Sequence, residues 1–325
     1  MTSIGVGIVG TGYAARTRAD AFYRDGRSHV AAIAGRDLEK TSALAQTCEA
    51  APLTDWHTLI QREDVDLVVI ATINRDHGAI AEAALQAGKH VVVEYPLSLD
   101  VAEAERILDL ARAKQKLLHV EHIELLSGIH GAIAQGLPHI GTPFYARYSS
   151  LVPQRPAPDR WTYRADLFGF PLIGALARIN RLIHLFGTVS RVAAESRFWG
   201  NMLPTNPFTS CLVTAQLTFS SGLVAEVIYG KGEAVWQSER TLAIHGEKGG
   251  IYIDGEAGTL ILPDGEHPLD TGSRRGLFAK DTAMVLDHLT TGASLYFTPE
   301  ASVYALKVAD AVRQAAETGE AVKVL

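Results

Sequence analysis

The sequence has 325 residues, of which 47% are hydrophobic and 20% are charged, so the chain is long and apolar enough for about two globular domains and is not disordered throughout. Its net charge of −6 gives no general basic field of the kind that favours nucleic acid or an anionic membrane. The two cysteines, Cys48 and Cys211, lie far apart and lack a CxxC spacing, which argues against a disulfide framework and a thiolate zinc site.

The beginning of the chain and its longest apolar runs bear on its location. The first residues do not form a basic segment followed by an apolar stretch, and no run approaches the roughly 18 uninterrupted apolar residues of a membrane span. We therefore expect a cytoplasmic protein that has neither a membrane nor a nucleic acid as a partner.

Residues 1–122 alternate short apolar runs with longer alanine-rich segments. The run LVVI at 67–70 is apolar on both faces, as a strand inside a helix-covered parallel sheet must be. The alternation predicts a doubly wound α/β domain over 1–122. The predicted strands are 5–9, 30–34, 66–71, 90–94 and 117–120, and the predicted helices are 14–24, 39–47, 77–87 and 101–114.

Residues 123–325 have a different pattern, with longer alternating runs that follow one another across turns. This pattern predicts a second, α+β domain with a large, mostly antiparallel open sheet. We leave open whether its terminal helix packs back on the first domain. The predicted strands are 142–151, 191–199, 211–219, 223–230 and 240–245, and the predicted helices are 174–186, 280–291 and 299–318.

The sequence IVGTGYAA at 8–15 places a GxGxxA motif between the first predicted strand and the first predicted helix. Gly10 permits a tight turn, Gly12 lets the backbone approach a pyrophosphate, and the small Ala15 allows close packing of helix on strand. This context favours a dinucleotide site over a purely structural turn. The predicted cofactor contacts in this turn are Gly10, Thr11, Gly12, Tyr13 and Ala14.

The end of the second predicted strand bears on the choice of coenzyme. An NAD site requires an acidic residue about 20 residues after the glycines, to hold the ribose 2′-hydroxyl. Here the strand ends in Gly35, which leaves room for a 2′-phosphate, and in Arg36, which can bind that phosphate or stack on adenine. We therefore expect NADPH (NADP+). In the alternative interpretation Arg36 is a solvated loop residue and Asp37 binds the hydroxyl.

Further cofactor contacts are expected after the third and fourth predicted strands, because ligands bind at the carboxyl edge of such sheets. His77 is either a polar contact or a cap at the start of a helix. Three roles are open for Glu94: it carries a proton, it anchors a hydrogen-bond network, or it is only a hydrogen-bonded carboxylate at the end of a strand. Tyr95 shapes the nicotinamide pocket, and its bond to Pro96 is a candidate cis peptide. The expected contacts are Ala71, Thr72, Asn74, His77, Glu94 and Tyr95.

The segments ATINRDH at 71–77 and AGKHVVVEYP at 87–96 resemble the Gfo/Idh/MocA oxidoreductase family. The resemblance implies a Rossmann domain followed by an α/β domain whose open sheet often mediates oligomers, so the chain is either a monomer or a homo-oligomer. Two features depart from the family pattern. The usual Glu-Lys-Pro is Glu94-Tyr95-Pro96, and Arg178 stands where an acidic residue is usual, with no histidine four residues later. These departures disfavour oxidation of a sugar alcohol.

Glu-Tyr-Pro is typical of biliverdin reductases, and the segments 119–126, 160–163, 168–171, 225–233 and 272–278 resemble the cyanobacterial type. The resemblance implies NADPH-dependent reduction of biliverdin IXα to bilirubin by hydride transfer to the C10 methine bridge. It also implies two stacked bilins and an essential arginine, which matches Arg178. The alternatives are an NADP-dependent dehydrogenase of a sugar or cyclic alcohol, and a catalytically silent sensor that binds NADPH or pigment.

The predicted helix 174–186 carries two arginines, Arg178 and Arg181, on the face opposite an apolar stripe formed by Leu176, Ile179, Ile183 and Phe186. Two arginines on one face are ordinarily solvated, but Leu185 on the same face also suits the wall of a cleft. A guanidinium stays protonated near neutral pH, so we expect Arg178 to stabilise developing negative charge or to orient a water that protonates a pyrrole.

The remaining candidates complete the predicted site. The predicted catalytic residues are Arg178, Glu94 and His122, the last as a weaker candidate for the acid. The predicted substrate contacts are Arg178, Arg181, Tyr95, Arg147, Arg274 and Arg275. His119 and His122 alternate in a strand, unlike the i,i+4 histidine pair of a helical metal site, so no metal is assigned.

Overall fold

The computed structural model describes residues 3–200, 206–273 and 275–324. The chain forms two compact units, Met1–Ile123 with Gly276–Val303 and Glu124–Arg275 with Tyr304–Leu325. The segment 276–303 therefore groups with the first unit, whereas the sequence pattern placed it in the second domain. Within the described residues, no helix is both long and apolar enough to cross a membrane.

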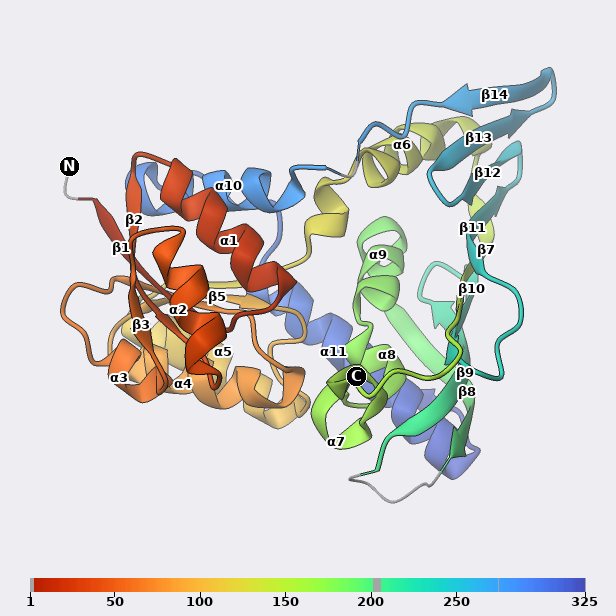
Figure 1. The fold of residues 1–325 in the computed structure, drawn as a ribbon. Helices are drawn as coiled ribbons and strands as arrows, with labels where there is room; N and C mark the ends of the chain where they lie inside the picture. Colours follow the sequence, from red (N-terminus) through yellow and green to blue (C-terminus); the bar gives the residue numbers. More distant parts are fainter. Residues whose placement is uncertain (1–2, 201–205, 274, 325) are drawn as a thin grey trace. The chain divides into compact units, whose positions relative to one another are not determined.

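The first unit contains a six-stranded sheet in the order β3-β2-β1-β4-β5-β6, in which all pairings are parallel (Figure 1). The predicted doubly wound sheet is confirmed. Its strands are β1 (Ile4–Val9), β2 (Ser28–Ala34), β3 (Ala51–Leu53), β4 (Leu67–Ile70), β5 (His90–Glu94) and β6 (Leu118–Glu121). Its helices include α1 (Tyr13–Arg24), α2 (Leu38–Gln46), α3 (Trp56–Ile60), α4 (His77–Gln86), α5 (Val101–Lys114) and α10 (Leu277–Thr291).

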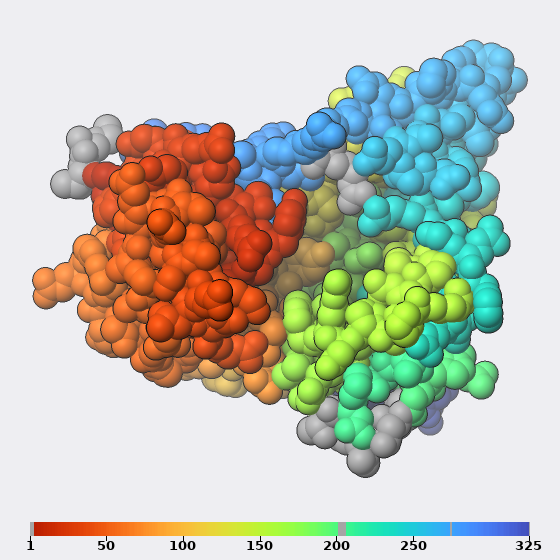
Figure 2. Space-filling view, viewed as in Figure 1, coloured from red at the N-terminus to blue at the C-terminus, as the bar shows by residue number. Residues whose placement is uncertain are grey.

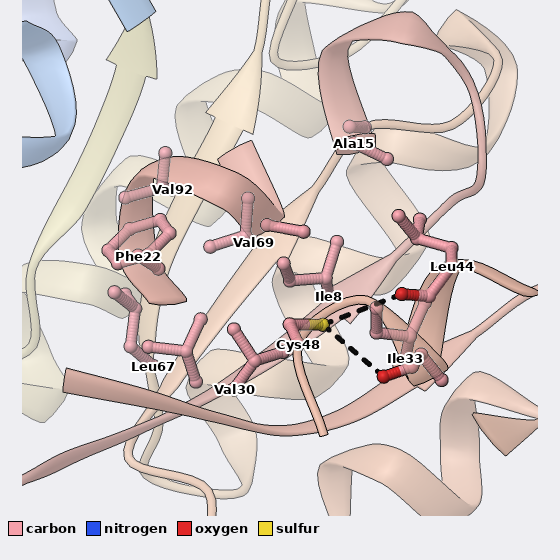
Figure 3. Close-up of a cluster of buried hydrophobic side chains, with 14 of the residues drawn as sticks. Ile8, Ala15, Phe22, Val30, Ile33, Leu44, Cys48, Leu67, Val69 and Val92 are labelled. Atoms are coloured by element: carbon pink, nitrogen blue, oxygen red, sulfur yellow. Dashed lines mark hydrogen bonds between the residues drawn. The ribbon is translucent and has the colours of Figure 1, made fainter. Parts of the chain in front are cut away.

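One face of this sheet is covered by α1, α2 and α10, which share a buried apolar cluster with the strands (Figure 3). Phe22 of α1, Leu44 of α2 and Val285 of α10 belong to this cluster together with strand residues such as Ile8. In the space-filling view, blue atoms of α10 lie beside red atoms of α1 (Figure 2). Buried apolar contacts explain why a segment so late in the sequence joins the first unit, since a chain-order pattern does not reveal which sheet a helix will cover.

Strand β3 and helix α3 were not predicted. The strand has three residues with a proline in the middle, Ala51-Pro52-Leu53, and it lies at the edge of the sheet. Proline lacks a backbone N–H, so within sheets it is tolerated mainly at such edges. A strand this short gives no alternating pattern that sequence analysis can detect.

The second unit contains a nine-stranded sheet in the order β14-β13-β12-β11-β7-β10-β9-β8-β15. All pairings are antiparallel except that of β10 with β7, which confirms the predicted mostly antiparallel sheet. Its strands are β7 (Pro143–Pro153), β8 (Val189–Gly200), β9 (Phe208–Phe219), β10 (Val224–Gly232), β11 (Glu239–Gly246), β12 (Gly249–Asp254), β13 (Ala257–Leu262), β14 (Gly265–Leu269) and β15 (Val322–Lys323). Its helices include α6 (Gly128–Gly136), α7 (Ala165–Phe168), α8 (Pro171–Gly174), α9 (Ala177–Phe186) and most of α11 (Pro299–Thr318).

The predicted helix 174–186 is interrupted at its start. Helix α8 ends at Gly174, and α9 begins at Ala177 after an irregular residue, Ala175. The predicted apolar stripe is only partly correct: Ile179 is fully buried, but so is Leu182, which does not belong to the stripe. Helix α9 is therefore buried over more than one face, which changes the interpretation of its arginines.

Candidate functional site

The turn between β1 and α1 has the geometry that the glycine motif predicts. Gly10 has a φ of +127°, and a Cβ there would lie 2.2 Å from the carbonyl oxygen of Ala71. Gly12 is the N-cap residue of α1 and makes no side-chain cap, and a Cβ built on it would meet no atom within 4 Å. The amino end of α1 is thus open and offers backbone N–H groups, as a pyrophosphate site requires.

Two aromatic side chains lie beside this helix start. Tyr13, the first residue of α1, is 79% exposed. Its ring meets the edge of Phe278 from α10, with the ring centres 6.1 Å apart. Sequence analysis named Tyr13 but missed Phe278, because their proximity depends on α10 joining the first unit.

The end of β2 lies directly against the glycine turn, since a Cβ on Gly35 would lie 2.7 Å from Thr11 Cγ2. Arg36 follows and is exposed. The carboxylate of Asp37 accepts the backbone N–H of Lys40 at 3.1 Å and forms an ion pair with Lys40 Nζ at 3.0 Å. These contacts, the backbone hydrogen bond above all, lower the pKa of Asp37. Asp37 is therefore engaged as the cap of α2.

His77 connects the loops that follow β4 and β5. Its Nδ1 lies 2.8 Å from the Pro96 carbonyl oxygen and its Nε2 lies 3.4 Å from the Thr72 carbonyl oxygen, so the shorter contact assigns the proton to Nδ1. The ring is buried, and burial lowers its pKa. His77 therefore fixes two loops at the carboxyl edge of the sheet instead of capping α4. Asn74, in the loop after β4, is also buried.

Glu94, the last residue of β5, and Tyr95, which follows it, lie at the same edge. Arg18 Nε donates to Glu94 Oε1 at 3.1 Å, and the Glu94 side chain is 16% exposed. The Tyr95–Pro96 bond is cis, as expected. The Tyr95 ring stacks on the His122 ring with centres 5.3 Å apart. His122 itself is fully buried and faces Ser302 Oγ at 3.0 Å, so in this structure it supports Tyr95 and does not reach an open surface.

In the second unit, α9 holds Arg178 against the sheet. Arg178 Nη2 donates to Ser150 Oγ at 3.3 Å, and the guanidinium lies 5.2 Å from the centre of the Tyr229 ring. Ser150 and Tyr229 are paired across β7 and β10, so they face the same side of the sheet. Burial raises the pKa of Tyr229, which keeps its hydroxyl neutral beside the cation.

Arg181, one turn later on α9, is only 8% exposed. Its Nη2 donates to the Glu124 carbonyl oxygen at 3.3 Å, and its guanidinium lies 5.9 Å from the Tyr148 ring centre. In the described part of the chain, no hydrogen bond reaches the buried Arg181 Nε. The interpretation of α9 as a solvated cationic surface is therefore wrong, and the arginines face Tyr148 and Tyr229 on one side of the sheet.

Among the other predicted substrate contacts, Arg147 does not face this pair. Arg147 precedes Tyr148 in β7 and so points to the opposite face of the sheet, where it is exposed and lies 4.0 Å from Glu239 Oε1. Arg275 is exposed, and its backbone N–H donates to Ser273 Oγ. Arg274 lies outside the described residues.

Sequence analysis missed a buried lysine near Arg178. Lys231 is 6% exposed, and its ammonium donates to the Thr162 carbonyl oxygen and lies 4.5 Å from the Tyr163 ring centre and 4.3 Å from that of Phe168. Burial lowers its pKa to about 8. The alternation of β10 gives the signal in retrospect, because Tyr229 and Lys231 share a face.

The family comparisons cover both units. Residues 4–122 match the Gfo/Idh/MocA family described as "Oxidoreductase family, NAD-binding Rossmann fold". Residues 132–324 match the C-terminal alpha/beta domain of the same oxidoreductase family. A curated dTDP-3,4-didehydro-2,6-dideoxy-alpha-D-glucose 3-reductase from Streptomyces violaceoruber is 31% identical over 252 residues, 74% of this chain and 72% of that protein. Mouse biliverdin reductase A is 32% identical over 135 residues, 42% of this chain and 43% of that protein.

Among solved structures, biliverdin reductase from Synechocystis sp. PCC 6803, in complex with biliverdin and NADP+, is 54% identical, with a TM-score of 0.94 over 97% of this chain and 100% of that chain. Levoglucosan dehydrogenase in complex with NADH and L-sorbose has a TM-score of 0.86 at 20% identity, covering 99% of each chain. The second likeness concerns the fold alone, whereas the first extends to more than half of the aligned residues.

Proposed function

We propose that this chain, which belongs to the Gfo/Idh/MocA oxidoreductase family, is an NADPH-dependent reductase that converts biliverdin IXα to bilirubin. The observation that carries the proposal is the 54% identity, over 97% of the chain, to a biliverdin reductase solved with biliverdin and NADP+. The arginine pair on α9 and the Glu-Tyr-Pro segment after β5 agree with it.

The coenzyme half of the proposal rests on residues of the first unit. The open amino end of α1 at Gly12 suits the pyrophosphate, and the loops fixed by His77 suit the nicotinamide end. Arg36 supplies a cation for the 2′-phosphate, while Asp37 is occupied by Lys40. NADPH bound there supplies a hydride to the C10 methine carbon of the bilin.

The substrate half rests on the second unit. Reduction of biliverdin to bilirubin adds one hydride at C10 and one proton at a pyrrole nitrogen, so negative charge develops on the pigment unless the proton arrives at the same time. Arg178, held by Ser150 and by the Tyr229 ring, stabilises this charge or orients the water that protonates the nitrogen. Its guanidinium stays protonated and does not itself act as the acid. Arg181, with its unsatisfied Nε, is suited to a propionate carboxylate.

A sugar dehydrogenase is the main alternative, and the similarity to a dTDP-sugar reductase supports it. Such chemistry requires a group that exchanges a proton with an alcohol or ketone. At the position where the family usually carries lysine this chain has Tyr95, whose ring packs on buried His122. A methine bridge has no hydroxyl to deprotonate, so loss of the lysine is compatible with bilin reduction.

The test is to mix purified protein, NADPH and biliverdin IXα and to record the visible spectrum together with absorbance at the NADPH band. We expect the biliverdin band to be replaced by that of bilirubin, with one NADPH oxidised per bilin. A panel of sugars and cyclic alcohols with NADP+ should give no comparable rate. Binding of pigment without turnover would identify a sensor, and turnover of a sugar alone would identify a dehydrogenase; either result would refute the proposal.

A further inference from the structure

A fully buried arginine lies beneath the coenzyme half of the site. Arg18 occupies the second turn of α1, after the glycine motif, and is 0% exposed. It reaches two carboxylates from distant parts of the sequence, Glu94 at the end of β5 and Asp281 of α10. Thr282 Oγ1 lies 3.4 Å from its Nη1, and the Phe278 ring centre lies 5.1 Å from its Cζ.

Asp281 is itself held from two sides. His119 Nε2 lies 2.8 Å from Asp281 Oδ1, and the Tyr296 hydroxyl donates to the same oxygen at 2.8 Å. Asp281 is 0% exposed and its pKa is well below the usual range, because the charge of Arg18 and the hydrogen bond with His119 outweigh the effect of burial. The partner of Arg18 is therefore a fixed anion and not a mobile surface group.

Glu94 is the only member of this ion-pair chain, within the described residues, that reaches solvent. Asp281 and Arg18 are completely buried, whereas the Glu94 side chain is 16% exposed at the carboxyl end of β5. The Arg18 contact engages Glu94 Oε1, and in the described part of the chain no hydrogen bond reaches Oε2. One oxygen is thus immobilised by the interior while the other remains available to a donor at the sheet edge, where such folds bind ligands.

We propose that Arg18, fixed by Asp281, is a positioning residue that sets the orientation of the Glu94 carboxylate toward the nicotinamide end of the coenzyme. The inference rests on the proposed function for the identity of the reaction, and adds a residue that acts on it through Glu94. An amide N–H, such as that of the nicotinamide carboxamide, is the class of donor that Glu94 Oε2 accepts. Misplacing a positioning group by about 1 Å can cost roughly 100-fold in rate, so the orientation of Glu94 is expected to matter.

The experiment is a double-variant cycle on the single-turnover rate of NADPH oxidation by biliverdin. Glu94→Gln and Arg18→Lys should each lower the rate by about 10-fold to 100-fold, with Kd for NADPH changed by less than about threefold. The double variant should be no slower than Glu94→Gln alone, within about twofold, because Arg18 acts through Glu94. Multiplied losses in the double variant, or a wild-type rate for Arg18→Lys, would overturn the inference.

Two further variants distinguish a loss of positioning from a folding defect. Arg24→Lys alters an arginine of the same helix that is 77% exposed and pairs only with Asp20 at 2.7 Å among the described residues, and it should retain the wild-type rate. Asp281→Asn loosens Arg18 without removing it, and its loss of rate should likewise disappear in the Glu94→Gln background. If circular dichroism shows that Arg18→Lys does not fold, the cycle of Asp281→Asn with Glu94→Gln tests the inference in its place.

A readout without any bilin separates this inference from the proposed function. The fluorescence of bound NADPH reports the surroundings of the nicotinamide, and Glu94→Gln and Arg18→Lys should change it in the same way. A change with Glu94→Gln but not with Arg18→Lys would refute the role of Arg18. If wild-type protein leaves biliverdin unreduced, the proposed function fails, whereas the fluorescence comparison still decides whether Arg18 positions Glu94.

Discussion

The Arg178 guanidinium lies 5.2 Å from the centre of the Tyr229 ring while its Nη2 donates to Ser150. Both partners are neutral, so the positive charge of Arg178 is oriented by them without being neutralised by them. In the proposed reaction, Arg178 is the residue that stabilises the negative charge that develops on the bilin.

Arg178→Ala should lower kcat for biliverdin reduction by about 100-fold or more, because a preorganised charge is lost where negative charge develops. Kd for NADPH should stay near the wild-type value, since the groups proposed to bind the coenzyme belong to the first unit. Arg178→Lys should recover only part of the rate, because it keeps the charge but not the planar fork. Equal losses of rate and of NADPH affinity would contradict the assignment.

Arg36→Ala should raise the KM for NADPH by roughly 10-fold or more while leaving that for NADH nearly unchanged, because only NADPH carries the 2′-phosphate. Asp37→Asn is the matched control, since its side chain caps α2 through Lys40. This variant should lower the free energy of unfolding and leave the ratio of the KM values for NADPH and NADH unchanged. Steady-state kinetics with both coenzymes give the answer.

Substitution of the two motif glycines should separate folding from coenzyme binding. Gly10→Ala places a Cβ 2.2 Å from the Ala71 carbonyl oxygen at a φ of +127°, so it should lower the free energy of unfolding by about 2 kcal/mol or more. Gly12→Ala meets no protein atom within 4 Å and should leave stability within about 0.5 kcal/mol. It should nevertheless weaken NADPH binding, as titration calorimetry can show, because the added methyl occupies the space of the pyrophosphate.

The pH dependence of the free energy of unfolding should reveal the lowered pKa of His130. Burial, with the nearby charge of Arg181, lowers its pKa from 6.5 to about 4, and its Nε2 lies 3.0 Å from His184 Nδ1. Between these two pKa values the unfolded chain binds a proton that the folded chain does not. The His130 contribution is therefore fully present above pH 6.5 and is lost as the pH falls, by about 2 kcal/mol at pH 5.

Urea unfolding of the wild type and of His130→Gln at pH 7.5 and pH 5 measures this effect. The wild type should lose more unfolding free energy between the two pH values than the variant does. Parallel losses would show that His130 does not carry the effect. His184 also has a pKa lowered by burial, so the comparison of the two proteins is needed to isolate the contribution of His130.

Local patterns predicted five strands of each sheet, but they did not predict β3 of the first sheet or β12, β13, β14 and β15 of the second. The apolar run at 67–70 forms β4 in the middle of the parallel sheet, and the glycine motif forms the expected tight turn, in which Gly10 has a positive φ. Hydrophobic periodicity was not sufficient to predict which side chains of α9 are buried. Arg178 and Arg181 look like a solvated face in sequence, whereas the sheet residues Tyr148 and Tyr229 lie against them.

Long-range contacts account for most of what the sequence did not reveal. Arg18 and Asp281 are 263 positions apart, and their pairing depends on α10 returning to the first unit. No local spacing signals such a pair. Lys231 was missed for a related reason: a lone lysine in a strand is ordinarily exposed, and only the folded packing of Tyr163 and Phe168 encloses it.

The central claim is hydride transfer from NADPH to the C10 methine carbon of biliverdin, and isotope transfer tests it most directly. Protein incubated with biliverdin IXα and NADPH that is deuterated at both C4 positions of the nicotinamide should give bilirubin carrying one deuterium at C10, detected by mass spectrometry and located by NMR. Bilirubin without deuterium, deuterium at another carbon, or unchanged biliverdin beside coenzyme-loaded protein would contradict the account.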